Sequence, residues 1–386
     1  MKILIVHNNY GKYSGEEAVV DKMAAMFREN GHTVSMLRMS SEECRDNFAG
    51  QVKGFLCGIY SPKGVKGLRE ALYRECPDVV NVHNLYPFIS PAALFECRKA
   101  GVPVVMTIHN FRLICPTGLF MRGGVPCELC LQKGNEWSCV RYNCEHSLPK
   151  SVGYTLRNVY ARWTGAYKKN VDRFACITDF QRKKLIEAGY DARKIAVIPN
   201  SAQAPESYEP TLGEYVAYIG RLSYEKGYDL LLEVARRNPD IDFRFAGAKR
   251  EQCDDSIPDN VSFEGYLHGE DLQNFIRNAR FTVMPSRCYE GFPMAILESA
   301  QYGKPTIGPD HGGFTEIIGA GDSAVGRLFC PGDVDDMESK VVELWNNPGE
   351  VSLLGEKAFE KLKREYSSEV IYEKWNELLN GVISNE

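Results

Sequence analysis

Several signals that would place a chain in a specialised class are missing from this sequence. No apolar run approaches the roughly 18 residues that span a bilayer, and neither half contains a G-x-G-x-x-G dinucleotide fingerprint, a Walker loop or a nucleic-acid-binding motif. The opening MKILIVHNN has a short apolar core with no small-residue cleavage site after it, so we interpret it as a first strand. These absences predict a cytoplasmic protein that binds no nucleic acid and uses neither nicotinamide nor P-loop chemistry.

The composition is that of an ordinary globular protein, with 44% hydrophobic and 25% charged residues. Its 386 residues exceed what one core usually serves, which predicts two domains. Residues 1–200 hold 28 Lys and Arg against 18 Asp and Glu, a net +10, whereas the remainder holds 18 against 33, a net −15. A basic first half suits an anionic partner such as a membrane surface or a lipid phosphate, although unevenly distributed solvated faces explain it equally well.

Strand-like and helix-like patterns alternate along both halves. The first half contains KILIVHN, HTVSML, DVVNVHN, VPVVMTIHN, RFACITD and KIAVIPN, with helical patterns at 16–30, 91–99 and 180–188. The second contains YVAYIG, DFRFAG, VSFEGYL, FTVMPS, KPTIGP and GRLFCP, with helical patterns at 228–237, 270–279, 293–302 and 335–346. Such alternation predicts an α/β fold of two Rossmann-like, doubly wound domains.

The domain boundaries follow from the gaps in this pattern. The polar, proline-containing stretch 201–213 predicts a linker between a domain at 1–200 and a domain at 214–365. The final residues 366–386 place their apolar side chains near one helical face, which must pack against another part of the chain.

The stretch YEGFPMAILE, residues 289–298, places two carboxylates around the start of a predicted helix. Ligands of open parallel sheets bind beyond the carboxyl ends of the strands, where Glu290 falls after FTVMPS. Pro293 fits the first helical turn, Gly291 allows close backbone approach, and free amides at a helix start bind anions. Glu290 and Glu298 are therefore expected to contact different parts of one elongated, phosphate-containing ligand.

A second pattern, GRLSYEKG, follows the strand YVAYIG. Here Gly220 and Arg221 end the strand, and Lys226 precedes a helix. An Arg guanidinium can donate bidentate hydrogen bonds to two phosphate oxygens, and a Lys ammonium supplies a compact positive charge, so both residue types suit a diphosphate. Most such basic residues are merely solvated, but their combination with Glu290 and Glu298 in one half strengthens the interpretation.

GRLSYEKG, followed about 60 residues later by an E-x7-E arrangement, resembles the donor half of the GT-B retaining glycosyltransferases of family 4, the group 1 glycosyl transferases. DVVNVHNLYPFISP, TIHN and KIAVIPNS are similar to its acceptor-domain segments. The resemblance implies two domains facing across a cleft, with the terminal helix returning to the first. It also implies transfer from a nucleoside-diphosphate sugar to a saccharide or lipid-linked acceptor, with retention and with no metal or other cofactor required for catalysis.

The resemblance also assigns roles to the donor residues. Arg221 and Lys226 would bind the diphosphate, Glu290 the hydroxyls of the donor sugar, and Glu298 the ribose. The loop under sugar and phosphate would consist of Gly291, Phe292 and Pro293, leading into Met294.

In the first half, the resemblance selects His109 in TIHN, which would lie near the transferred sugar. The position of His109 in the sequence, taken alone, favours an ordinary loop histidine whose hydrogen bonds are satisfied within the protein. Gly15 and Glu16 follow the first strand where the family usually has a glycine pair, but Ser14 replaces the first glycine. The implied mechanism is front-face substitution, with Glu290 as a positioning group.

Thirteen cysteines occur, and five of them crowd into residues 115–144. The C-x2-C spacing of Cys127 and Cys130 is typical of a zinc knuckle. Two of the other cysteines, with Cys115 and Cys144 as the selected pair, or His146 would complete a structural zinc site. Packed thiols or labile disulfides are the alternative interpretation.

Residues 154–174 interleave basic and aromatic side chains at roughly helical spacing. This pattern is compatible with peripheral contact to the inner face of an anionic membrane, and also with a surface helix whose aromatics join the core. A sugar epimerase or phosphorylase on the same fold, or a non-catalytic partner protein, remain alternative functions.

Overall fold

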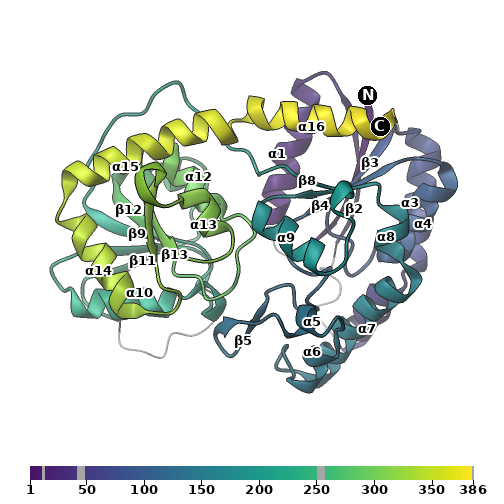
Figure 1. The fold of residues 1–386 in the computed structure, drawn as a ribbon, viewed down its shortest axis with the longest axis horizontal. Helices are drawn as coiled ribbons and strands as arrows, with labels where there is room; N and C mark the ends of the chain where they lie inside the picture. The colour runs from purple at the N-terminus through teal and green to yellow at the C-terminus, as the bar shows by residue number, and fades with distance from the viewer. Residues whose placement is uncertain (11–13, 41–47, 250–256, 385–386) are drawn as a thin grey trace. The chain divides into compact units, whose positions relative to one another are not determined.

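The computed structural model describes residues 1–10, 14–40, 48–249 and 257–384 (Figure 1). The chain forms two compact units. The N-terminal unit comprises Met1–Phe120, Glu128–Pro199 and Tyr372–Glu386. The C-terminal unit comprises Met121–Cys127 and Asn200–Ile371. The predicted linker 201–213 contains only an isolated bridge, Ala202 to Ser367.

A six-stranded sheet forms the centre of the N-terminal unit. Its strands are β1 (Lys2–Asn9), β2 (Thr33–Ser40), β3 (Val79–Val82), β4 (Val104–Ile108), β7 (Arg173–Cys176) and β8 (Ile195–Val197). The spatial order is β2-β1-β3-β4-β7-β8, and every pair is parallel. Strands β3 and β4 are buried along their whole length, as expected for a sheet covered on both faces.

Helices connect these strands. They are α1 (Gly15–Glu29), α2 (Phe48–Ile59), α3 (Pro62–Glu75), α4 (Leu94–Ala100), α7 (Leu148–Thr164), α8 (Ala166–Asn170) and α9 (Asp179–Glu187). Helix α1 begins with a capping box, in which Ser14 accepts from the Glu17 amide and Glu17 accepts from the Ser14 amide. Between β4 and α7 lie the hairpin β5 (Met121–Arg122) and β6 (Val125–Pro126) and the short helices α5 (Leu129–Gln132) and α6 (Trp137–Arg141).

The C-terminal unit repeats the architecture. Its strands are β9 (Tyr215–Ile219), β10 (Phe243–Ala246), β11 (Val261–Gly265), β12 (Ala279–Val283), β13 (Thr306–Pro309) and β14 (Gly326–Phe329). They are parallel, in the order β11-β10-β9-β12-β13-β14. The helices are α10 (Tyr228–Arg237), α11 (Gly269–Asn278), α12 (Met294–Ala300), α13 (Gly313–Ile318), α14 (Val334–Trp345) and α15 (Pro348–Lys361). A core that includes Phe243, Phe245 and Phe281 packs this sheet against its helices.

The last helix, α16 (Ser368–Ile383), joins the N-terminal unit from Tyr372 onward. Trp375 is 1% exposed, and its ring lies edge-on to Phe27 of α1 with centroids 5.9 Å apart. The Tyr372 hydroxyl is 3.0 Å from His32 Nε2.

The prediction of two parallel, doubly wound α/β domains is confirmed, and every predicted strand is present with shifted ends. The sequence analysis did not predict α2, α3, α5, α6, α13 and α15. Within the described residues no helix has the length and apolar character that a bilayer crossing requires.

Candidate functional site

Both sheets have a point at which strand order reverses, and the predicted site residues gather at these points. In the C-terminal sheet the reversal lies between the neighbours β9 and β12, and in the N-terminal sheet between β1 and β3. Open α/β sheets bind ligands there, because connections on opposite faces leave a crevice at the carboxyl ends of the strands.

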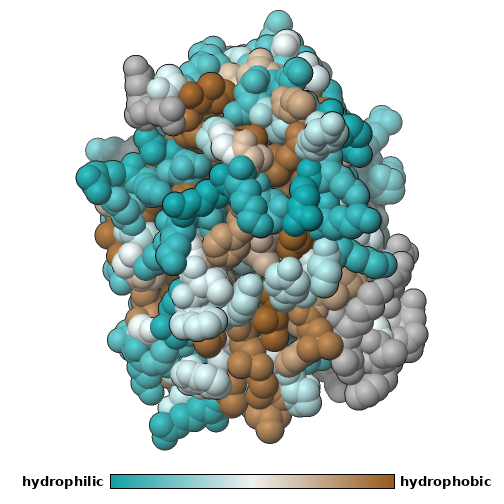
Figure 2. All heavy atoms as spheres, turned by 90° about the vertical axis from the view of Figure 1, so that its right-hand side faces the viewer, coloured by the Kyte–Doolittle hydropathy of each residue, from teal (hydrophilic) through white to brown (hydrophobic). Residues whose placement is uncertain are grey.

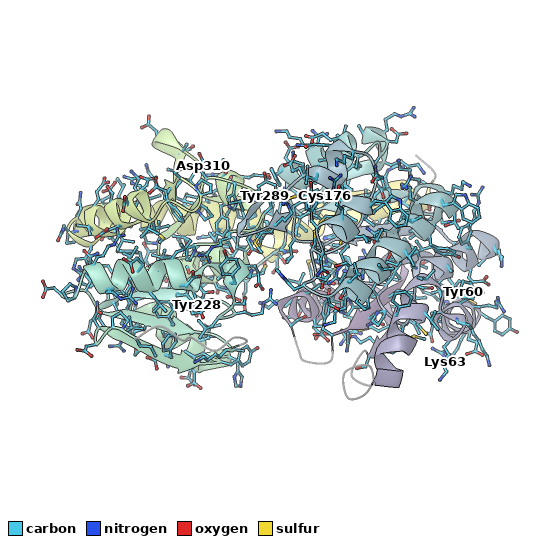
Figure 3. All side chains as sticks on the ribbon, turned by 90° about the horizontal axis from the view of Figure 1, so that it is seen from below. Tyr60, Lys63, Cys176, Tyr228, Tyr289 and Asp310 are labelled. Atoms are coloured by element: carbon cyan, nitrogen blue, oxygen red, sulfur yellow. The ribbon has the colours of Figure 1, made fainter. Side chains whose placement is uncertain are left out.

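In the C-terminal unit the structure brings Lys226 and Glu290 together. Lys226 ends the 3-10 turn Tyr224–Lys226 after β9, and Glu290 lies in the loop after β12, next to Tyr289 (Figure 3). Lys226 Nζ is 2.5 Å from Glu290 Oε1, and Ser286 Oγ donates to the same oxygen at 2.6 Å. The described residues direct these bonds at Oε1 only, which leaves Oε2 for a ligand.

Both Lys226 and Glu290 are charged near neutral pH. Burial alone would raise the pKa of Glu290, but the Lys226 ammonium and the Ser286 hydroxyl outweigh it and lower that pKa. Burial likewise opposes the charge on Lys226, yet attraction to Glu290 raises the Lys226 pKa. The site therefore presents a fixed ammonium beside a fixed carboxylate.

Arg221 lies close to this pair, after Gly220 at the end of β9. Its Nη2 is 3.2 Å from Glu225 Oε1, and its side chain is 41% exposed. The Tyr218 hydroxyl donates to the Arg221 carbonyl at 2.7 Å. The guanidinium is thus oriented by one carboxylate while it stays accessible to an anionic ligand.

Gly227 explains how the Lys226 turn reaches the end of β12. Its φ is +68°, and a Cβ atom there would lie 1.9 Å from the Pro285 carbonyl oxygen. Only glycine allows this conformation and this approach together.

Sequence reasoning missed a second loop, after β13. The amide of Gly313 donates to the Glu290 carbonyl at 2.8 Å, and a Cβ on Gly313 would lie 2.3 Å from the Gly291 carbonyl oxygen. The His311 ring lies edge-on to Tyr289, with centroids 5.4 Å apart. The glycine pair in HGGF, one residue after the predicted strand KPTIGP, was the available signal.

The remaining predicted donor residues lie along α12. Glu298 is half-buried within this helix, as its spacing predicts. Pro293 caps the helix and Met294 begins it, so the proline lies just before the first turn, contrary to the expectation. Phe292 is 7% exposed and packs edge-on against Tyr366, so its ring belongs to the core and its backbone alone remains a candidate for the ligand loop.

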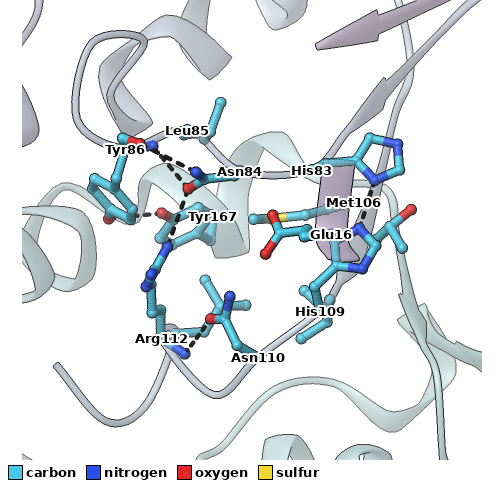
Figure 4. Close-up of a pocket in the computed structure, with 13 residues that line it drawn as sticks. Glu16, His83, Asn84, Leu85, Tyr86, Met106, His109, Asn110, Arg112 and Tyr167 are labelled. Atoms are coloured by element: carbon cyan, nitrogen blue, oxygen red, sulfur yellow. Dashed lines mark hydrogen bonds between the residues drawn. The ribbon is translucent and has the colours of Figure 1, made fainter. Parts of the chain in front are cut away.

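The N-terminal unit contains a small cavity of about 30 Å³ at the carboxyl ends of β3 and β4 (Figure 4). The predicted residues Glu16 and His109 line it, together with His83, Asn84 and Arg112, which the sequence analysis did not select. The signal was the polar ending of two strands, in NVHN and TIHNFR.

His83 and His109 form a hydrogen-bonded pair, with His83 Nδ1 2.7 Å from His109 Nε2 and their rings stacked at 5.0 Å. Burial lowers the pKa of both rings, so both are neutral and share one proton. His83 Nε2 is buried without a hydrogen-bond partner in the described part of the chain. A proton is therefore best placed on His83 Nδ1, which leaves His109 protonated on Nδ1 as a donor.

A second chain of polar contacts holds Glu16 in the cavity. The Tyr10 hydroxyl donates to Glu16 Oε2 at 2.9 Å, and Arg112 Nη1 donates to that hydroxyl at 2.9 Å. Arg112 also contacts Asn84 Oδ1 at 3.3 Å. Gly15 is the exposed first residue of α1, and a Cβ there would have no atom within 4 Å. Among the described residues, nothing therefore fills the space next to Gly15.

The predicted zinc quartet of Cys115, Cys127, Cys130 and Cys144 is not assembled. No three His, Cys, Asp or Glu side chains among the described residues lie close enough to hold a metal ion. Cys127 belongs to the C-terminal unit and the other three to the N-terminal unit. Instead, the Cys144 thiol contacts the Cys139 thiol, which lowers the pKa of Cys139 despite its burial.

In the basic stretch 154–174, Arg157 is buried, while Arg162, Lys168 and Lys169 are exposed. Arg157 is buried between Tyr86 and Tyr154, with its guanidinium 4.3 Å and 4.2 Å from their ring centroids. Arg162 Nε and Nη2 contact the two carboxylate oxygens of Glu136 at 3.0 and 3.1 Å. Arg157 therefore packs among aromatic side chains of the core, whereas Arg162 lies at the surface with a side chain that is 53% exposed.

Two protein-family models match consecutive parts of the chain. Residues 13–202 match the family described as Glycosyltransferase Family 4, and residues 201–361 match Glycosyl transferases group 1. Together they extend from residue 13 to residue 361.

Individual proteins are also similar. Alpha-D-kanosaminyltransferase of Streptomyces kanamyceticus is 26% identical over 305 residues, which cover 72% of this chain and 71% of that protein. Anabaena Alr3699/HepE in complex with UDP and glucose has a TM-score of 0.68 at 15% identity and covers 99% of this chain and 100% of its own. The apo form of the lipopolysaccharide outer core galactosyltransferase WaaB has a TM-score of 0.65 at 17% identity, and the match covers 100% of both chains.

Proposed function

Because this chain belongs to the GT-B glycosyltransferases of group 1, we propose that it transfers a hexose from a nucleoside-diphosphate sugar, most simply a UDP-sugar, to a hydroxyl of a saccharide or lipid-linked saccharide. The observation that carries the proposal is the Lys226–Glu290 pair beside Arg221 at the switch point of the C-terminal sheet. The UDP and glucose in the HepE complex support this donor. The name of WaaB supports a role in surface polysaccharide or lipopolysaccharide synthesis.

In the proposed reaction Arg221 and Lys226 bind the diphosphate and stabilise the negative charge that develops on it as it leaves. The bond from the anomeric carbon to the phosphate oxygen breaks, and its electron pair stays on the phosphate. The acceptor hydroxyl attacks from the same face and its proton passes to the departing phosphate oxygen, so configuration is retained. Because two protein cations balance the leaving group, we propose that the step needs no metal.

Glu290 has two tasks in this scheme. Its Oε1 fixes Lys226, and its Oε2 faces the donor sugar and accepts from sugar hydroxyls. Glu298, within α12, would accept from the ribose diol. His109, held by His83, would donate from Nδ1 to the transferred sugar in the N-terminal unit.

The donor proposal is tested by thermal shift with UDP-, GDP-, ADP-, CMP- and dTDP-sugars and with NAD as a control. A ligand that binds only the folded state raises its stability, so one nucleotide family is expected to raise the melting temperature. Lys226→Ala is expected to remove that shift and the turnover. Lys340→Ala removes an ion pair on α14 outside the site and is expected to preserve both.

Other results would contradict the proposal. A persistent shift in Lys226→Ala would remove the donor assignment. Product analysis separates the alternative enzymes, since an epimerase changes the nucleotide sugar without an acceptor and a phosphorylase forms a sugar phosphate. No shift with any nucleotide sugar, in folded protein, would favour the non-catalytic alternative.

We also propose that the protein works at the cytoplasmic face of a membrane, where lipid-linked acceptors are presented. The N-terminal unit exposes large apolar side chains, among them Leu56, Leu148 and Trp163. Figure 2 shows apolar side chains gathered in the lower half of one face. Sedimentation with anionic vesicles tests this proposal, and a protein that stays in the supernatant would contradict it.

A further inference from the structure

A second cavity lies in the N-terminal unit next to the one that contains His109. It has a volume of about 170 Å³, against about 30 Å³ for the first. The segment 130–136, the helices α7 and α8, and the end of α9 form its walls. Arg112, Leu113 and Tyr167 line both cavities, so a ligand chain that begins beside His109 has a larger space immediately next to it.

The walls of this larger cavity carry an excess of positive charge. Arg112, Arg162 and Lys168 line it, and Glu136 is the one carboxylate among its lining residues. Glu136 is 5% exposed, and both of its carboxylate oxygens are occupied by Arg162. A ligand with a negative group is therefore favoured over a neutral one.

Two cations keep donors for such a ligand. Arg162 uses Nε and Nη2 on Glu136, its Nη1 has no partner among the described residues, and its side chain is 53% exposed. Lys168 Nζ donates one hydrogen bond, to the Gly189 carbonyl at 2.7 Å, and lies 4.9 Å from the centroid of the Tyr190 ring. The ammonium thus retains two N–H groups next to an aromatic ring that also lines the cavity.

We propose that this cavity binds an anionic sugar residue of the acceptor, with its negative group on Arg162 and Lys168 and its ring beside Tyr190. The negative group is either the carboxylate of a uronic acid or a phosphate ester, because both offer the same acceptor oxygens to these donors. Mixed apolar and polar walls suit a sugar ring, which has both kinds of surface. The inference rests on the proposed transfer reaction, since it names the acceptor that the reaction would use.

The test measures binding of glucuronic acid, glucose 6-phosphate and glucose to the full chain by ligand-observed NMR titration. Both anionic sugars are expected to bind about tenfold more tightly than glucose, because a hydrogen bond to a charged group contributes more than a neutral one. Preference for one of the two anions identifies the source of the charge. Equal binding of glucose, or no binding of either anion, would overturn the proposal.

Two variants locate the binding. Lys168→Gln is expected to weaken anionic sugar binding several-fold, whereas Lys169→Gln, at the exposed neighbouring position, is expected to preserve it. Ala188→Trp places a large ring in the cavity wall and is expected to abolish binding. Ala192→Trp, on an exposed turn, is the matched control and is expected to preserve binding. Unchanged binding in Ala188→Trp would contradict the assignment.

Donor binding is recorded in the same samples. A nucleotide-sugar shift that persists while no anionic sugar binds removes this inference and leaves the transferase proposal intact. Anionic sugar binding without any nucleotide-sugar shift would support the cavity assignment and contradict the transferase proposal, because the protein would then have no donor site.

Discussion

At the scale of single residues, the candidate site depends on side chains whose protonation states are set by burial and by their neighbours. Lys226 and Glu290 stay charged because each offsets the desolvation of the other. The histidines beside the N-terminal cavity stay neutral because burial disfavours their protonated forms. The candidate residues of the C-terminal unit are therefore charged, and the histidine pair of the N-terminal unit is neutral.

His7 gives this arrangement a measurable pH dependence. It is fully buried, and burial is the main cause that lowers its pKa from 6.5 to about 4, against an opposing effect of Glu16. Between pH 6.5 and about 4 the His7 ring is protonated in the unfolded chain but neutral in the folded chain. This group therefore does not lower the free energy of unfolding above pH 6.5, and it lowers that free energy progressively as the pH falls toward 4. At 1.36 kcal/mol per pKa unit, this one group accounts for about 3 kcal/mol.

Denaturant unfolding at several pH values checks the prediction. His7→Gln is expected to show a shallower loss of stability across this window. His268→Gln, at an exposed position, is expected to keep the original slope. An identical slope in His7→Gln and in the unmodified protein would assign the effect to other groups.

At the scale of elements, short loops after the strands position the donor site more than the strands themselves. The turn that ends at Lys226 lies against Pro285 because Gly227 has a positive φ and no side chain. The loop at Gly313 lies against the Glu290–Gly291 backbone because Gly313 has no side chain to clash with the Gly291 carbonyl oxygen. Both contacts join loops that are far apart in the sequence.

Gly227→Ala is expected to damage this arrangement. An alanine would incur the positive-φ strain of about 1–2 kcal/mol, and its Cβ would clash with the Pro285 carbonyl oxygen at 1.9 Å. The turn must then shift and move Lys226 away from Glu290. We expect a lower melting temperature and weaker nucleotide-sugar binding.

Gly332→Ala separates the two effects. Gly332 has a φ of +80° with no atom within 4 Å of the added Cβ, so this variant carries strain without a clash. It is expected to lose some stability and keep donor binding. Equal donor binding in both variants would show that the turn tolerates the shift.

At the scale of the whole molecule, α16 ties the end of the chain to its beginning. The helix begins in the C-terminal unit and belongs to the N-terminal unit from Tyr372. Its contact with α1 is made through Trp375 and Phe27, which are 1% and 0% exposed. The N-terminal unit is therefore built from segments that lie far apart in the sequence.

Trp375→Ala tests this closure. Removing a buried tryptophan leaves a cavity and typically costs about 3–5 kcal/mol. Hydrogen exchange of the full chain is expected to show faster exchange in α1 and α16. Trp163→Ala removes a side chain that is 83% exposed and serves as the matched control, with little expected change. Unchanged exchange in Trp375→Ala would mean that α16 contributes little to the unit.

The sequence by itself determined the fold class and the donor motif. Continuous apolar strands such as VPVVMTIHN can only be buried on both faces, and the residues after them must meet at one sheet edge. Lys226 and Glu290 were therefore both predicted to lie in one ligand site, although 64 positions separate them and their direct ion pair was not predicted. Periodicity also revealed α16 and the burial of Trp375.

Tertiary structure alone decided how these residues are paired and which of the candidates belong to the core. Phe292 belongs to the core because Tyr366 lies next to it, and no three of the candidate zinc ligands among the described residues lie close enough to share a metal ion. His83 joins His109, and Gly313 joins Glu290, through contacts between segments that no local pattern connects. The physical reason is that hydrogen bonds, burial and pKa values depend on neighbours in space, whereas propensity and periodicity report only neighbours along the chain.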